Sequence, residues 1–113
     1  MKKYIILYYA PMDAMQQMSQ ATPEEQQKGM EAWMSWSQSC GDHLVELGAP
    51  LMNGLKLRTD GTSENSDKEV TGYSIMQAEN IEGVKKMLDK HPHLTWNANC
   101  SIEIHETMPL PDM

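Results

Sequence analysis

The sequence predicts an α+β fold in which two helices cover one face of a four-stranded antiparallel sheet. Three observations lead to this prediction. Four segments have the apolar, β-branched or alternating composition of strands, and two follow the spacing of amphipathic helices. They follow one another in the order β-α-β-β-α-β. The 113 residues suffice for one ordinary core, with a folded surface of about 6,300 Å², and not for two domains.

The first expected strand covers Tyr4 to Ala10 and is apolar on both parities, as a strand covered on both faces is. The two lysines before it imitate the start of a signal peptide. The apolar run is short, however, and breaks at Pro11 without a small-x-small cleavage site. We therefore interpret it as a central strand and expect a cytoplasmic protein. No segment approaches the ~18–20 apolar residues that cross a membrane.

The first expected helix runs from about residue 23 to residue 47. It begins with an N-cap hydroxyl at Thr22, a proline at the first helical position and a glutamate three residues after the cap. The apolar residues behind this start recur at the 3, 4, 7 spacing of one helical face. We expect Gly48 to end the helix.

Two strands and a turn are expected next. Residues 51–59 contain a short alternating strand, and residues 60–67, which have no apolar side chain, form a polar turn or loop. Residues 69–78 return as a strand, with Gly72 at a point where another backbone comes close.

The last two expected elements complete the βαββαβ order. Asn80 caps a second helix that ends before Pro92, and residues 99–107 alternate between apolar and polar side chains. This order is that of a ferredoxin-like sandwich. Two helices cannot cover the second face of the sheet, so we expect two copies to pack their sheets together as a homodimer.

The net charge and the positions of the methionines and cysteines indicate which macromolecules and metals the chain is expected not to bind. Sixteen acidic residues against nine Lys and Arg give a net charge of −7, which argues against nucleic acid and membrane partners. Met12, Met15 and Met18 have a spacing that suits Cu(I), but no His or Cys accompanies them, so we expect packing instead. Cys40 and Cys100 lack metal-site spacing and are expected as reduced thiols. We expect no metal and no cofactor.

Six segments in order resemble the YCII-related family of small bacterial dimeric α+β barrel proteins. They are KKYIILYYAP, TPEEQQKGMEAWMSWSQ, GAPLMNGLKL, GYSIMQAENIEG, KHPHL and SIEIHETMPLP. The resemblance covers essentially the whole chain and implies a single YCII-related domain over residues 1–113. It further implies a homodimer with one cleft per subunit.

The characterised branches of that family look like dehydrochlorinase-type or lyase-type enzymes with a His–Asp pair. Here the position of the helix histidine falls near Glu31 to Trp33, and no histidine occurs before His43. The aspartate position, directly before a proline, is occupied by His91. That acid–base pair is therefore absent in its family form.

Several side chains remain as candidates for a site. His91 is expected to border the cleft and to meet Glu103 and His105, which share one face of the last strand. The alternatives are helix-terminal capping for His91 and a solvated edge for the strand pair. The three are also the candidates for catalysis. The residues we assign to the ligand-binding cleft are Tyr8, Trp33, Tyr73, His91, Glu103 and His105.

Three functions stay open at the level of sequence. The first is a small-molecule-binding protein with an adaptable, Met-rich cleft that takes a partly apolar ligand. The second is a cofactor-free enzyme with lyase-like acid–base chemistry. The third is a protein-interaction partner in bacterial signalling or transcription. His43, on the flank of the first helix, is interpreted as a partly buried structural histidine.

Overall fold

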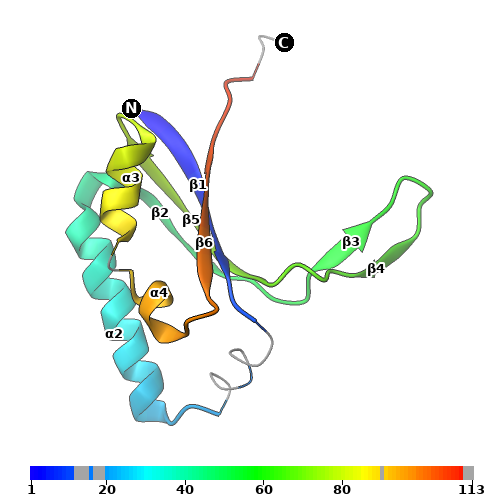
Figure 1. Ribbon diagram of the computed structural model, residues 1–113, viewed down its shortest axis with the longest axis horizontal. Coiled ribbons are helices and arrows are strands. Elements are labelled where there is room, and N and C mark those ends of the chain that lie inside the picture. Colours follow the sequence, from blue (N-terminus) through cyan, green and yellow to red (C-terminus); the bar gives the residue numbers. More distant parts are fainter. Residues whose placement is uncertain (12–15, 17–19, 90, 111–113) are drawn as a thin grey trace.

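The computed structural model describes residues 1–11, 16, 20–89 and 91–110. The strands of its main sheet lie in the order β2-β5-β1-β6 and are all antiparallel to their neighbours, which confirms the ferredoxin-like α+β fold (Figure 1). These strands are β1 (Lys2–Tyr9), β2 (Leu44–Pro50), β5 (Val70–Ala78) and β6 (Ser101–Glu106). The helices are α2 (Pro23–Cys40), α3 (Ile81–Leu88), α4 (Pro92–Trp96) and the short 3-10 turn η1 (Gly41–His43). The segment that contains Met12, Met15 and Met18 lies outside the described residues.

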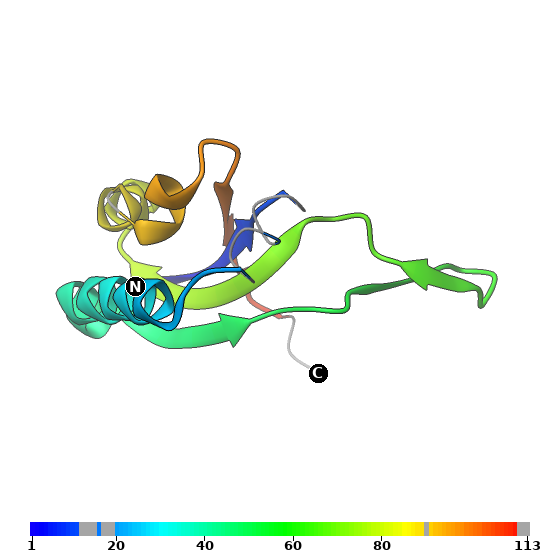
Figure 2. The ribbon, with the colours of Figure 1, turned by 90° about the horizontal axis from the view of Figure 1, so that it is seen from below.

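The helices α2, α3 and α4 lie on one side of the sheet, which Figures 1 and 2 show from two directions. The side chains of β1 therefore divide into two sets. Tyr4, Ile6 and Tyr8 point under the helices and are fully buried or nearly so, while Ile5 and Leu7 lie on the opposite face and are half-buried. Both sets of β1 side chains are thus apolar, and none of the described helices covers the second face. We call it the open face.

The helix α2 begins as predicted and ends earlier than predicted. Thr22 Oγ1 accepts a hydrogen bond from the backbone N–H of Glu25, and Pro23 occupies the first turn. Gly41, at φ +55°, ends the helix seven residues before Gly48. The following residues 44–50 form an edge strand of the sheet, so the prediction of helix up to residue 47 was wrong.

Gly48 belongs to this edge strand, and its role is different from a helix stop. It has φ +82°, and a Cβ atom there would lie 1.8 Å from the carbonyl oxygen of Tyr73 on β5. The register between β2 and β5 shifts between Glu46 and Ala49, the step that contains Gly48. Gly48 thus permits a close approach of two backbones, which no other residue type allows at this φ.

The strand predicted over residues 51–59 does not join the main sheet. Its central part, β3 (Leu55–Leu57), pairs with β4 (Ser63–Asn65) in a separate two-stranded sheet. We call residues 51–69 the β3–β4 arm. It projects from the body on the side of the open face, away from the helices (Figures 1 and 2).

The last part of the chain follows the prediction with one addition. Asn80 Oδ1 accepts from the backbone N–H of Gly83 and caps α3, as expected. The short helix α4 was not predicted. It begins at Pro92 and its N-cap is His91, so the chain re-enters a helix at the proline that was expected only to terminate one.

Candidate functional site

His91 occupies the centre of an aromatic cluster between the helices and the sheet. The chain places it directly after α3 and before α4, and the side chain is fully buried. Its ring centroid lies 4.3 Å from that of Trp36, 4.4 Å from Trp33 and 5.0 Å from Tyr8. Both tryptophans come from α2 and the tyrosine comes from β1, so a helix and a strand of the main sheet together enclose the imidazole.

Hydrogen bonding fixes the tautomer of His91. Its Nδ1 atom accepts a hydrogen bond of 2.9 Å from the backbone N–H of His93. A backbone N–H can only donate, so Nδ1 carries no proton and the neutral ring carries its hydrogen on Nε2. That Nε2–H group is buried and has no hydrogen-bond acceptor among the described residues.

Burial keeps this imidazole neutral. It lowers the pKa of His91 to about 3, and the neighbouring His93 adds a smaller effect in the same direction. A buried donor without an acceptor costs free energy, commonly about 1–3 kcal/mol. The site therefore presents a neutral donor that gains from any acceptor placed within reach.

The phenol of Tyr8 lies beside His91 and is satisfied. Its hydroxyl is 2.8 Å from Ser74 Oγ, and Ser74 in turn donates to the carbonyl oxygen of Leu47 at 2.5 Å. Because Ser74 uses its hydrogen for that carbonyl, the Tyr8 hydroxyl donates to Ser74. Burial raises the pKa of Tyr8 to about 12, only partly offset by the bond to Ser74. The phenol therefore stays protonated at neutral pH and does not serve as an acid or a base there.

His93 holds the cluster to the sheet. Its Nε2–H donates to the carbonyl oxygen of Tyr9 at 2.8 Å, and its ring lies 5.3 Å from that of Tyr8. Burial lowers the pKa of His93 as well. The alternative of helix-terminal capping for His91 is confirmed in one respect, because its ring caps the N-terminus of α4 rather than the C-terminus of the helix before it.

An open groove runs along the outer side of the cluster, between α2 and the pair α3 and α4. Trp36 lines it and at the same time contacts His91, and the indole Nε1–H of Trp36 donates to the carbonyl oxygen of Met87 at 2.8 Å. The other residues of the groove are Ala32, Ser35, Ser39, Lys86, Met87, Asp89, Pro92 and Thr95. Trp36 thus contacts both the groove and the imidazole.

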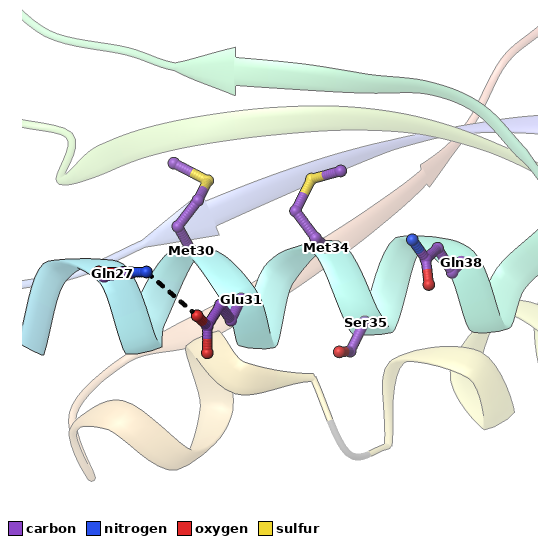
Figure 3. Close-up of a pocket in the computed structure, with 6 residues that line it drawn as sticks. All are labelled: Gln27, Met30, Glu31, Met34, Ser35 and Gln38. Carbon is purple, nitrogen blue, oxygen red and sulfur yellow. Dashed lines mark hydrogen bonds between the residues drawn. The ribbon is translucent and has the colours of Figure 1, made fainter.

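A second hollow lies on the exposed side of α2, shown in Figure 3. Met30 and Met34 project from the same side of the helix one turn apart, and the amide of Gln27 donates to Glu31 at 3.4 Å. All the side chains that line this hollow are exposed. It offers no buried polar atom to a ligand, so the groove beside Trp36 is the better candidate.

Glu103 and His105 do not meet His91. In the antiparallel register, Glu103 lies opposite Leu7 and His105 opposite Ile5, both on the open face, whereas Tyr8 carries the His91 cluster on the covered face. The expected grouping was therefore wrong, since the sheet separates its members. The pair does form on its own, with 2.7 Å between His105 Nε2 and Glu103 Oε1, and both side chains are exposed.

The six residues assigned to the cleft thus divide between two faces. Tyr8 and Trp33 join His91 on the covered face. Tyr73 lies on the open face, where its hydroxyl donates to Glu46 at 2.8 Å. Tyr9 donates to Glu103 on the same face, at 3.4 Å.

Sequence reasoning missed Trp36 as a member of the site, although its spacing of three residues from Trp33 places both on one helical face.

His43 is half-buried, with Nδ1 2.9 Å from the carbonyl oxygen of Gln77, as a structural histidine should be. Cys40 and Cys100 are free. Among the described residues, no three His, Cys, Asp or Glu side chains are placed to hold a metal ion, and no helix is long and apolar enough to cross a membrane.

Comparison with known proteins adds little to this geometry. No protein-family model and no curated protein matches the sequence. Among solved structures, the chain is similar to the 5-chloro-2-hydroxyhydroquinone dehydrochlorinase of Burkholderia phenoliruptrix AC1100, in complex with 2,5-dihydroxybenzoquinone. The identity is 15%, the TM-score is 0.49, and the match covers 89% of this chain and 90% of that chain.

Proposed function

We propose that this chain binds a small, flat and partly apolar molecule beside His91, with access through the groove between α2 and the pair α3 and α4. One observation carries the proposal, namely the buried His91 Nε2–H group, which has no acceptor in the part of the chain that the structure describes. The rings of Tyr8, Trp33 and Trp36 surround this donor and suit a flat ligand. The ligand should present a carbonyl, ether or phenolate oxygen as acceptor.

Binding explains the site better than acid–base catalysis does. A catalytic acid or base works best with a pKa near the operating pH. The pKa values of His91 and Tyr8 are instead displaced to about 3 and about 12, so neither group changes its protonation near pH 7. The exposed pair of Glu103 and His105 lies across the sheet and cannot serve a ligand held at His91.

We further propose that the chain is a YCII-related protein and acts as a homodimer whose subunits pack through their open faces. The order of the six motif segments supports the first statement, and the apolar open face supports the second. Ile5 and Leu7 lie on that face without cover from any helix. The ligand sites would then lie on the two outer, helix-covered sides of the dimer.

Acetophenone and ethylbenzene form a matched pair of probes for the site, because only the first has a carbonyl oxygen. We expect acetophenone to bind about tenfold more tightly, which is the effect of one added buried hydrogen bond. Long-range ¹H–¹⁵N spectra of the histidine rings should place the proton of His91 on Nε2, and its signal should shift with acetophenone.

His91→Phe keeps an aromatic ring in the cluster and removes the donor, so it should abolish the preference for acetophenone. His105→Phe changes an exposed histidine on the other face and is the matched control, with the preference retained. Equal binding of both probes by the unaltered protein would contradict the proposal. So would an Nε2–H signal unmoved by either probe, which would mean that the donor is satisfied by the face of a tryptophan ring.

A further inference from the structure

The β3–β4 arm has one charged face and one apolar face. In its register Lys56 lies opposite Glu64, and the Glu64 carboxylate contacts both Lys56 and the guanidinium of Arg58. The alternate positions Leu55 and Leu57 therefore share the other face of the ribbon, opposite Asn65 and Ser63. The ribbon is amphipathic, and its two leucines are exposed among the residues that the structure describes.

The exposure of this apolar side is unusually high. Leu55 is 61% exposed, Leu57 is 74% exposed and Met52, at the base of the arm, is 81% exposed. An isolated two-stranded hairpin is marginally stable in water, and exposed ion pairs contribute roughly 0–1 kcal/mol each. The arm therefore needs a surface on which its leucines can pack.

The direction of the arm indicates where that surface lies. The arm leaves the body between β2 and β5 and extends past the open face, on the side opposite the helices (Figures 1 and 2). About ten extended residues separate Pro50 from the turn at Asp60, a reach of roughly 30 Å. A second sheet stacked on the open face would lie only about 10 Å away. The arm is longer than this distance, so it would reach past that second sheet.

The total surface area gives an independent measure. The chain exposes 8503 Å², against about 6,300 Å² for a compact monomer of its mass. The excess, roughly 2,200 Å², exceeds the ~800 Å² that each partner buries in an interface of standard size. The radius of gyration, 15.8 Å, is likewise larger than the ~13 Å of a compact domain of this length. A chain of this shape has the surface that a dimer needs.

We propose that the β3–β4 arm is exchanged between two copies of this chain, each arm packing its Leu55 and Leu57 face on the other copy. The inference rests on the homodimer proposed above and adds a second contact region to it. The two sheets would contact each other through their open faces, and each arm would add a contact with the other copy outside that flat interface. The partner of the arm is thus a second copy, and its apolar side is buried only in the dimer.

A pair of double variants on one strand tests this inference. Leu55→Ser with Leu57→Ser removes the apolar face, and Lys56→Ser with Arg58→Ser alters the charged face by the same number of substitutions. Sedimentation over a dilution series should show the unaltered chain at twice its mass of 12.8 kDa. We expect the leucine variant to raise the dimer dissociation constant by at least about tenfold and the charge variant by no more than about threefold.

Hydrogen exchange gives a second readout on the unaltered protein. The backbone amides of residues 55–57 and 63–65 should be protected at high concentration and should lose that protection on dilution below the dissociation constant. Circular dichroism of each variant confirms that the body, to which the arm contributes no core residue, stays folded.

The outcomes separate the two proposals. If the unaltered chain is a dimer but both double variants dimerise equally well, the arm exchange is wrong and the sheet-face dimer stands. If the unaltered chain is a monomer at high micromolar concentration with unprotected arm amides, both proposals are wrong.

Discussion

At the scale of single residues, the structure gives His91 different neighbours from those that the sequence predicted. The sequence singled out this histidine because it occupies the slot before a proline where the family it resembles places an aspartate, and the structure finds it buried among the rings of Tyr8, Trp33 and Trp36. The predicted partners of His91, Glu103 and His105, were wrong, because alternate side chains of a strand point to opposite faces of the sheet. Ile102 and Ile104 face the helices, so Glu103 must face the other way. The alternation visible in the sequence already contained that separation, but the depth at which His91 is buried depends on contacts between distant segments.

His91 also predicts how stability depends on pH. Its pKa is about 3 in the folded chain and near 6.5 when unfolded. Between these values the unfolded chain binds a proton that the folded chain does not, so stability is complete above pH 6.5 and falls as the pH decreases towards 3. The loss within that window is at most about 1.4 kcal/mol per pH unit for this group.

Urea unfolding at pH 7, 6 and 5 would measure this effect. His91→Phe should flatten the decrease in unfolding free energy relative to the unaltered protein, whereas Leu94→Phe, at an exposed and uncharged position of α4, should leave it unchanged. Curves for His91→Phe that run parallel to those of the unaltered chain would show that His91 becomes protonated without unfolding.

At the scale of elements, the caps were predictable and the end of α2 was not. Thr22 and Asn80 act within three residues of themselves, so local sequence suffices for them. Leu44 and Leu47 fit the helical spacing of α2 and equally fit a strand edge. Only Gly41, whose φ of +55° suits no other residue type well, ends the helix in time for residues 44–50 to pair with β5.

Two glycines give opposite predictions for the same substitution. Gly48→Ala should destabilise the chain by more than about 1 kcal/mol, because φ +82° is strained for alanine and the new methyl group would clash with the carbonyl oxygen of Tyr73. Gly29→Ala lies inside α2 with nothing within 4 Å, so it should stabilise by up to about 1 kcal/mol. Thermal unfolding followed by circular dichroism measures both, and a stable Gly48→Ala protein would refute the close approach of β2 to β5.

At the scale of the whole molecule, the two faces of the main sheet differ: the described helices cover one face and leave the other open to solvent. The helices complete a core on the covered face, in which Tyr4, Ile6 and Met76 are fully buried. On the opposite face Ile5, Leu7 and Ile75 form a half-buried apolar centre, flanked by the Glu103–His105 pair on β6. The sequence predicted this imbalance from one fact, the apolar character of both parities of β1. It did not predict the arm, whose short strands contain too few residues to show a period.

A charge introduced at the centre of the open face tests the assembly as a whole. Leu7→Lys places an ammonium group between Tyr73 and Glu103 in the register of the sheet, where a second copy would have to desolvate it. We expect this variant to remain folded, since Leu7 is only half-buried in the single chain, and to sediment as a monomer at micromolar concentration. Its melting temperature should be independent of concentration, whereas that of the unaltered chain should rise with concentration if it dimerises as proposed. Leu94→Lys, the same change on the exposed side of α4, should leave both properties as they are. Dimerisation of Leu7→Lys with unchanged affinity would place the interface elsewhere than on the open face.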